Sequence, residues 1–426
     1  MVPALVITMS PFTALALLLT LAALSSYVNH RFVGLPNTAA LMLVSLLISV
    51  GFTVGSFFGL PFKGMLEDVL RQVNLSQSLL GGVLSFLLFA GALNIDLKQL
   101  REQRWRVFSL AFVSTLLSVG LAAVLAFWVF RWLGMPIPFL YCLLFGALIS
   151  PTDPIAVLSL LKNANAPAAL EVKIAGESLL NDGVGVVAFV FFLESLLATG
   201  PVLDLEWQRA LELLLREAGG GIALGLALGW VAFGLIKSVD DYRVEILLTL
   251  ALVTGSYALA LALHVSGPLT IAVAGIVIGN PGRQLAMSEQ TRHNLDTFWD
   301  LADEILNALL FAVIGLQVVA LKLHGGYFAA ALVMIPIMLL IRIVSVGGPG
   351  TLFRLFGRPV EGRGGFLLLV WGGLRGGVSV AMALSLPAGT ERDLLLVVTY
   401  VVVAFSILVQ GTTIPWLLRR TLHSHA

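Results

Sequence analysis

Apolar stretches long enough to cross a lipid bilayer recur along almost the whole chain, and short polar or Pro/Gly-rich breaks separate them. A transmembrane helix needs about 20 residues to cross about 30 Å of hydrocarbon. The pattern predicts an all-α polytopic membrane protein with about 13 transmembrane helices. The predicted spans lie near residues 9–28, 36–58, 75–94, 107–130, 139–161, 174–198, 210–236, 244–263, 265–279, 298–321, 326–346, 364–387 and 393–417.

Composition supports this class and excludes several others. Hydrophobic residues make up 58% of the 426-residue chain and charged residues 12%, and the mean hydropathy is +0.98, which a soluble domain of this length could not cover with polar surface. The breaks are too short to fold a soluble catalytic domain, and no Gly-rich phosphate loop is present. The single Cys142 excludes a disulfide framework. We therefore expect neither an enzyme nor a nucleic-acid-binding protein, and no bound cofactor.

Positive charge is distributed unequally between the two sets of breaks. The breaks that follow odd-numbered spans carry 16 Lys and Arg residues, whereas the N-terminus and the breaks that follow even-numbered spans carry 7. The positive-inside rule places the first set in the cytoplasm, so we expect the N-terminus outside and the C-terminus inside a bacterial-type cytoplasmic (inner) membrane. Arg342 and Arg375 are the two cations left within spans. Arg342 is close to the predicted end of its span and is expected to extend to the inner surface.

The fifth and the twelfth predicted spans are interrupted near the middle of the membrane. The fifth contains Ser-Pro-Thr-Asp-Pro at 150–154, and each proline lacks an N–H and disfavours helix in the residue before it. The twelfth contains four glycines around Arg375. Irregular backbone is not tolerated against lipid, so we expect both breaks to be buried in protein or to line a water-filled cavity, with the break that carries Asp153 facing the break that carries Arg375. Two matching interruptions in an odd number of spans indicate two inverted six-helix repeats joined by one extra helix, a common plan for secondary transporters.

Four polar residues lie close together in the sixth span: Glu177, Ser178, Asn181 and Asp182. A charged residue inside the membrane costs about 2.5–3.5 kcal/mol on insertion scales, so two carboxylates here require a function. Glu177 and Asn181 share one helical stripe, and Ser178 and Asp182 share the next. With Arg375 taken as the only central cation, Glu177 is paired with it by elimination.

Asp182 is then left without a fixed partner. Burial disfavours the charged form of a carboxylate, so Asp182 can exchange a proton for a cation near neutral pH. Hard monovalent cations prefer oxygen ligands, and Asp182, Ser178 and Thr152 can supply a carboxylate, hydroxyls and a freed carbonyl. These three residues predict a binding site for a transported monovalent cation.

Three short motifs in this order resemble a known family. They are Pro-Thr-Asp-Pro at 151–154, Glu-Ser-Leu-Leu-Asn-Asp-Gly at 177–183 and Gly-Gly-Leu-Arg-Gly-Gly-Val-Ser at 372–379. Together they resemble the sodium/proton exchanger (NhaP-like) branch of the monovalent cation:proton antiporters, and the resemblance covers essentially the whole chain.

The resemblance implies a secondary active antiporter that exchanges Na⁺, with K⁺ or Li⁺ as alternatives, for H⁺ in an electroneutral one-for-one cycle. It further implies a homodimer embedded in membrane lipid, in which a core part moves against an interface part in an elevator-like motion. The interface part corresponds to about residues 1–105 and 205–323, and the core part to about 106–200 and 326–418. Residues 419–426 form a short cytoplasmic tail.

The resemblance also implies roles for individual residues. Asp182 carries the cation or the proton, Ser178 and the main-chain carbonyl of Thr152 contribute oxygens, and Asn181 ties the opened helix in place.

Further residues of the motifs support the site. Glu177 pairs with Arg375, and Asp153 neutralises helix ends at the crossing, although a direct part for Asp153 in binding the cation or proton stays open. The chain departs from the family at Ala90, where many bacterial relatives carry an acidic residue before a glycine.

Two other functions are considered from the residues. Asp153 and Asp182 could supply the two aspartates of an intramembrane aspartyl protease, but such a dyad shares a proton between otherwise free acids, and here prolines and an asparagine surround them differently. A cation channel is the second alternative, but no repeat of a carbonyl-rich filter sequence is present.

Four acidic residues lie near the cytoplasmic ends of predicted spans: Asp96, Glu245, Asp303 and Glu304. We expect solvated helix ends here, and an acidic funnel that attracts cations is the alternative.

Overall fold

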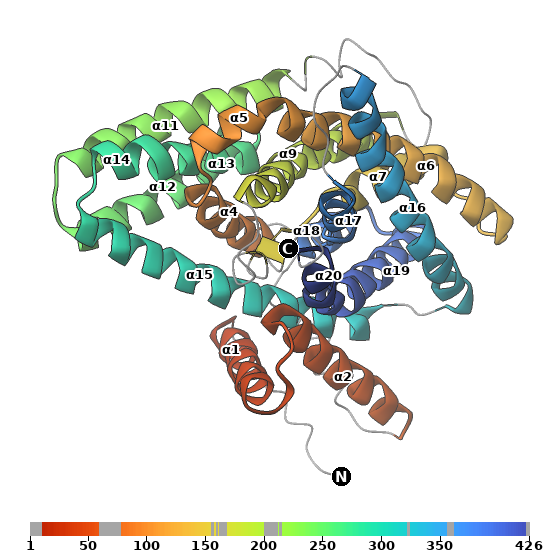
Figure 1. Ribbon diagram of the computed structural model, residues 1–426. Helices are drawn as coiled ribbons and strands as arrows, with labels where there is room; N and C mark the ends of the chain where they lie inside the picture. Colours follow the sequence, from red (N-terminus) through yellow and green to blue (C-terminus); the bar gives the residue numbers. More distant parts are fainter. Residues whose placement is uncertain are drawn as a thin grey trace.

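The computed structural model is a bundle of helices (Figure 1), and it describes residues 11–58, 78–154, 157–158, 161, 168–199, 212, 215–321, 324–355 and 362–422. Within these residues, 9 helices are long and apolar enough to cross a membrane. The remaining four predicted spans, the third, fifth, ninth and twelfth, contain shorter helices, so each predicted span contains helix within the described part of the chain. The prediction of an all-α polytopic membrane protein is therefore confirmed.

The main helices of these nine spans are α1 (Pro11–Val28), α2 (Asn37–Phe57), α6 (Thr115–Trp132), α9 (Ala168–Thr199), α11 (Gly220–Lys237), α12 (Tyr242–Leu263), α15 (Glu289–Leu316), α16 (Gly325–Leu355) and α19 (Thr390–Phe405). The shorter ones are α4 (Ser78–Leu93), α5 (Leu97–Phe108), α7 (Phe139–Ile149), α13 (Gly267–Val277), α14 (Arg283–Leu285), α17 (Arg363–Trp371), α18 (Gly377–Leu384) and α20 (Thr412–Leu422). Short π-helical or 3₁₀ segments extend several of them: η1 (Asn29–Val33), η2 (Ser109–Ser114), η3 (Leu215–Gly219), η4 (Ile278–Gly282), η5 (Gln317–Ala320) and η6 (Ser406–Gly411).

The break expected before the fourth span is helical, which corrects the sequence prediction. Asp96 caps α5, because its carboxylate accepts hydrogen bonds from the backbone N–H groups of Lys98 (2.8 Å) and Gln99 (3.3 Å). From there α5, η2 and α6 form one helical stretch from Leu97 to Trp132. The basic residues counted in this break therefore lie on the first turns of a helix, at its polar end.

Several residues used to assign the orientation lie outside the described residues, together with the ends of some spans. They are Lys63, Arg71, Lys162, Arg209, Lys322 and Arg358, and the tail is described only to residue 422.

Buried apolar side chains form two large clusters in the bundle. One contains Trp299, Phe89 and Ile271 and joins α4, α11, α12, α13 and α15; the rings of Phe89 and Trp299 lie 4.7 Å apart. The other contains Phe130 and Phe145 and joins α6, α7, α16 and α19. Figure 1 shows these two groups on opposite sides of the molecule. Helix α9 contacts α4 and α13 as well as α6 and α7, so it lies between them.

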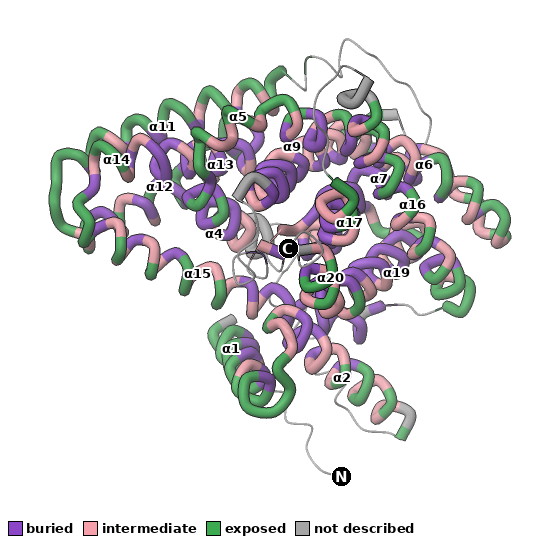
Figure 2. The backbone as a smooth tube through the Cα atoms, in the orientation of Figure 1, coloured by how far each residue is buried: buried purple, intermediate pink, exposed green. Residues whose placement is uncertain are grey.

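The outer faces of the helices are apolar rather than charged. Exposed side chains include Trp230 on α11, Leu247 on α12 and Leu340 on α16, and Figure 2 shows exposed positions along the outer sides of these helices and buried ones toward the centre. Large apolar patches of this kind are rare on soluble proteins. They are the surface expected of an integral membrane protein in contact with lipid.

Candidate ion-binding site

The two interrupted helices meet at the centre of the bundle. Helix α7 ends at Ile149, residues 150–154 are not helical, and residues 372–376 separate α17 from α18. The backbone N–H of Asp153 donates to the carbonyl of Leu374 (2.8 Å), and the two residues form an isolated antiparallel bridge. The prediction of crossed broken helices is therefore confirmed.

Arg375 supplies hydrogen bonds to the opened end of α7. Its guanidinium donates to the carbonyl of Ser150 and to that of Pro151 (3.0 Å), and its backbone N–H donates to the hydroxyl of Ser406 (2.9 Å). The last carbonyls of a helix have no partner within the helix and carry partial negative charge. Arg375 thus neutralises the C-terminal end of α7.

The ion pair predicted between Glu177 and Arg375 is wrong, because Glu177 pairs with Arg342. The Nη1 atom of Arg342 lies 2.5 Å from Oε1 of Glu177, and both side chains are buried. The other terminal nitrogen of Arg342 donates to the carbonyl of Leu369 on α17 (3.0 Å). Arg342 therefore does not extend to the membrane surface.

The physical reason for this error is the length of α16. The sequence prediction ended the span at 346, which placed Arg342 about one turn from its end, whereas α16 continues to Leu355 and places Arg342 in its middle. The glycine at position 373 is the feature of the sequence that is consistent with a bulky side chain, here that of Arg342, packing against the backbone of the break. A Cβ at this position would lie 2.4 Å from Nε of Arg342, so only glycine admits the guanidinium here.

Asn181 bridges the opened segment. Its amide nitrogen donates to the hydroxyl of Thr152 (2.8 Å), and its amide oxygen accepts from the backbone N–H of Thr152 (3.3 Å). The hydroxyl of Ser178 donates to the carbonyl of Thr152. Helix α9 therefore holds the non-helical backbone of residues 150–154 through two of its side chains, and it brings oxygen atoms of Ser178 and Thr152 together.

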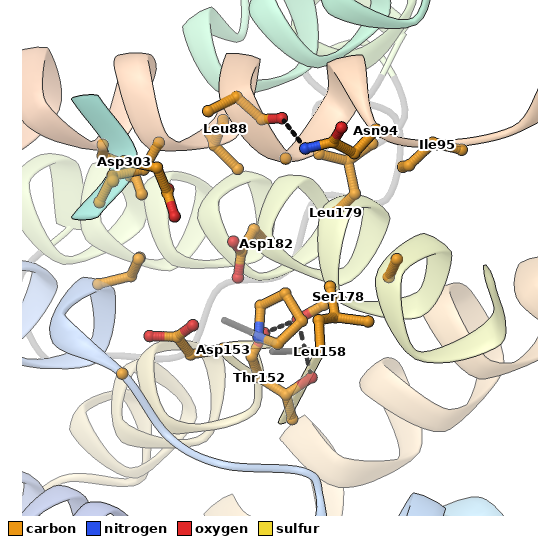
Figure 3. Close-up of a pocket in the computed structure, with 18 of the residues that line it drawn as sticks. Leu88, Asn94, Ile95, Thr152, Asp153, Leu158, Ser178, Leu179, Asp182 and Asp303 are labelled. Atoms are coloured by element: carbon orange, nitrogen blue, oxygen red, sulfur yellow. Dashed lines mark hydrogen bonds between the residues drawn. The ribbon is translucent and has the colours of Figure 1, made fainter. Parts of the chain in front are cut away.

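Asp182 lies one turn beyond Ser178 on α9 and faces a cavity (Figure 3). The cavity has a volume of about 510 Å³, and its wall includes Asp182, Ser178, Thr152 and Asp153. Asp182 is 7% exposed and forms no ion pair with any described residue. The four residues predicted to bind the cation or the proton thus share one cavity, whereas Glu177, Asn181 and Arg375 do not line it.

Asp153 lies beside the first residues of α18. A Cβ on Gly376 would be 2.4 Å from Oδ2 of Asp153, so the carboxylate occupies the space next to this glycine. The N-terminus of a helix carries partial positive charge, which a nearby carboxylate offsets. Arg375 and Asp153 therefore sit at helix ends of opposite polarity on either side of the crossing.

The cavity extends from the crossing to the first turns of α5 and α9, which carry basic residues, and along the middle of α15. Its outer wall includes Asp96, Gln99, Glu171 and Asp300. By the charge distribution, this is the side expected to be cytoplasmic. Ala90, where the resemblance led us to expect an acid in relatives, also lines the cavity.

Two acidic residues expected at solvated helix ends have other surroundings. Asp303 lines the cavity, which favours the alternative of an acidic funnel at this position. Glu245 is fully buried, where it accepts a hydrogen bond from Thr291 (3.2 Å). Sequence position alone could not reveal these surroundings, because they depend on how α12 and α15 pack.

Crossed broken helices beside a buried carboxylate that has no ion pair with any described residue are typical of an ion-coupled membrane transporter. The model of the transmembrane sodium/hydrogen exchanger family matches residues 16–420, and the chain belongs to this family. Proteins of this family are secondary transporters and not enzymes, so the protease alternative is set aside.

Individual relatives agree with this assignment. The chain is 46% identical over 410 residues to the Na(+)/H(+) antiporter NhaP of Pseudomonas aeruginosa, covering 95% of this chain and 96% of that protein. It is 34% identical over 394 residues to the Na(+)/H(+) antiporter NhaH of Halobacillus dabanensis, covering 90% and 92%. The solved structure of the sodium proton antiporter MjNhaP1 from Methanocaldococcus jannaschii matches with a TM-score of 0.73 at 20% identity, covering 97% of this chain and 98% of that one, so the folds agree.

Removal of one member of the Glu177–Arg342 pair is expected to destabilise the protein. Arg342→Gln leaves a buried carboxylate without its partner, which costs about 3–5 kcal/mol. The double variant Glu177→Gln/Arg342→Gln removes both charges and should recover part of this loss. Thermal unfolding in detergent, followed by size-exclusion chromatography, measures both effects. The pairing would be contradicted if the double variant lost as much stability as the single variants Glu177→Gln and Arg342→Gln added together.

The space at Gly376 gives a second prediction. Gly376→Ala places a methyl group against the carboxylate of Asp153, so the crossing must shift, and we expect transport to fall by about tenfold or more, since a misplacement of about 1 Å can cost even more. Gly255→Ala is the matched control, because no atom lies within 4 Å of a Cβ there. Transport rates are compared at equal protein levels in vesicles. Equal rates for the two variants would show that the contact at Gly376 is unimportant.

Proposed function

We propose that this protein exchanges Na⁺ for H⁺ across the cytoplasmic membrane, with Asp182 as the shared binding site. The observation that carries this proposal is the meeting of the Asp182 carboxylate, the Ser178 hydroxyl and the Thr152 carbonyl at one cavity beside the crossing. Membership of the sodium/hydrogen exchanger family and the similarity to bacterial Na(+)/H(+) antiporters support the same activity. K⁺ and Li⁺ are alternative substrates, because the ligand types do not distinguish them.

The binding chemistry follows from the hydrogen bonds at the crossing. The Ser178 hydroxyl directs its proton to the Thr152 carbonyl and lies 3.3 Å from the Thr152 hydroxyl, from which it can accept, so one lone pair of Ser178 stays available to a cation. The Thr152 carbonyl has a second lone pair, and the ionised Asp182 supplies the negative charge. A proton on Asp182 removes that charge, so proton and cation exclude each other at the site. Release of H⁺ then creates the site for the cation, and binding of H⁺ expels it.

The charge balance of the proposed cycle favours one-for-one exchange. Glu177 is neutralised by Arg342, and Arg375 is held by the carbonyls of Ser150 and Pro151, so these charges stay fixed. Asp182 alone alternates between H⁺ and a monovalent cation. Each half-cycle then moves the same charge, and transport is electroneutral.

The arrangement of the chain in the membrane is part of the proposal. The N-terminus lies outside and the C-terminus in the cytoplasm, so the cavity opens inward. Two chains form a homodimer through the interface part, about residues 1–105 and 205–323. The core part, about residues 106–200 and 326–418, moves against it and carries the crossing from one side of the membrane to the other.

Asp182→Asn tests the assignment of the site. The substitution keeps the shape of the side chain but removes the titrating charge, so Na⁺ should no longer dequench a pH-sensitive dye in everted vesicles. The same assay with K⁺ and Li⁺ on the unmodified protein establishes the selectivity. Unchanged dequenching by Asp182→Asn at normal protein levels would refute the role of Asp182.

The stoichiometry is tested with membrane voltage. In proteoliposomes that hold a potential set by K⁺ and valinomycin, one-for-one exchange of Na⁺ or Li⁺ should respond to the ion gradients and not to the voltage. Moving one net charge across 100 mV would supply about 2.3 kcal/mol and shift the point of zero flux. If the point of zero flux moves with voltage, exchange is not electroneutral, and Asp153 becomes the candidate for a second transported charge.

A further inference from the structure

Three polar side chains on the last span face the second broken helix. Ser406, Gln410 and Thr413 follow one another at spacings of four and three residues in one helical stretch from Thr390 to Thr421, so they lie on one side of it. This stretch packs on both halves of the broken helix, because α19 contacts α18 and α20 contacts α17 (Figure 1). Ser406 is 1% exposed and Gln410 is 4% exposed, so these two side chains lie inside the protein and away from lipid.

Each of the three side chains forms a hydrogen bond with the broken helix. The hydroxyl of Ser406 accepts from the backbone N–H of Arg375 (2.9 Å), and the amide nitrogen of Gln410 donates to the carbonyl of Trp371 (3.3 Å). The hydroxyl of Thr413 accepts from the indole N–H of Trp371 (2.9 Å). The last span therefore contacts the residue that ends α17 and, four positions later, the arginine of the break.

These hydrogen bonds meet the same need as those at the first break. The last carbonyls of α17 have no partner within that helix, and buried backbone N–H groups outside a helix also require one. At the first break Asn181 of α9 supplies the partners for Thr152, and at the second Ser406 and Gln410 supply them. Both belong to the π-helical segment η6, and such segments within α-helices are frequent at functional sites.

The hydrogen bond between Ser406 and Arg375 connects the last span to the ion site. The guanidinium of Arg375 donates to the carbonyls of residues 150 and 151, which directly precede Thr152. The carbonyl just before Arg375 accepts from the backbone N–H of Asp153 (2.8 Å), which directly follows Thr152. The second break thus holds the backbone on both sides of Thr152, whose carbonyl is one of the oxygens of the ion site.

We propose that Ser406 and Gln410 are positioning residues for cation binding. They hold the second break in place, and the break in turn sets the position of the Thr152 carbonyl. Neither residue lines the cavity, so their effect on the ion passes through Arg375 and the backbone around it. A binding group must be held within about 0.5 Å of its productive position. That the affected ion is the transported cation rests on the proposed function.

Ser406→Ala is the first test, because it leaves the N–H of Arg375 without its acceptor. In everted vesicles at equal protein levels, the KM for Na⁺ should rise by about three- to tenfold. Ser406→Thr keeps the hydroxyl and should restore the KM. Ser256→Ala is the matched control, since Ser256 on α12 is also 1% exposed and its hydroxyl has no hydrogen-bond partner among the described residues. A merely structural role would reduce the amount of active protein and not change the KM, so an unchanged KM in Ser406→Ala would overturn the proposal.

Gln410→Met tests the second contact with a side chain of similar shape that cannot donate to the Trp371 carbonyl. The KM for Na⁺ should rise by about threefold or more. Thr412→Val is the control on the same span, because the Thr412 hydroxyl donates only to carbonyls of its own helical stretch, at Leu408 (2.7 Å) and Val409 (3.2 Å). Equal KM values for the two variants would contradict the role of Gln410.

Hydrogen–deuterium exchange in detergent measures the holding of the break without any transport. Backbone N–H groups exchange when their hydrogen bonds open, so peptides that cover residues 372–376 should exchange at least about threefold faster in Ser406→Ala than in Ser256→Ala. Equal exchange in the two variants would overturn the proposal, whatever their transport rates. If Asp182→Asn still exchanges Na⁺ for H⁺, the proposed function fails, and faster deuterium uptake in Ser406→Ala would still support the holding of the break by Ser406.

Discussion

The structure depends on the cost of opening a helix inside a membrane. Backbone N–H and C=O groups that leave a helix within hydrocarbon cannot be satisfied by water, and each costs several kcal/mol if it stays unpaired. The prolines at 151 and 154 force such an opening. Two buried polar side chains at the crossing answer this need: Arg375 donates to the carbonyls that end α7, and Asn181 pairs with the backbone of Thr152. The Thr152 carbonyl, which the opening of the helix frees, then contributes to the ion site together with Ser178 and Asp182.

The same constraint explains why one carboxylate is set apart from the others. An arginine placed at a helix end needs no acidic partner, because the carbonyls themselves carry partial negative charge. Arg375 is used in this way, so Glu177 takes its counter-charge from Arg342 on another helix. Once these charges are satisfied, Asp182 is left facing the cavity without an ion pair among the residues that the structure describes. A carboxylate in that position responds to a proton or a cation, whereas a carboxylate in a buried ion pair is held by its partner.

The sequence was sufficient to predict the class, the spans, the two broken helices and the residues that share the cavity. These features depend on local patterns: apolar length, the positions of proline and glycine, and the spacing of Ser178 and Asp182. The partner of Glu177 could not be obtained in this way, because it depends on which helix faces α9 and on where α16 ends. The start of α5 was missed for a related reason, since an amphipathic helix rich in Arg and Lys resembles a cytoplasmic loop when only hydropathy is considered. The burial of Glu245 likewise arises from packing between helices.

The two walls of the cavity differ in a way that matters for exchange. The wall on α9 holds a carboxylate whose neighbours are hydrogen-bonded to the opened backbone, so any movement of the crossing carries Asp182, Ser178 and Thr152 together. The wall on α15 is fixed by different contacts, including the buried Trp299 and the packing of α15 on α2 and α4. Relative motion of the two walls would separate Asp303 from Asp182 while leaving the oxygen cluster of the crossing intact. An ion held by the crossing would then travel with it, so the crossing can link cation movement to proton movement.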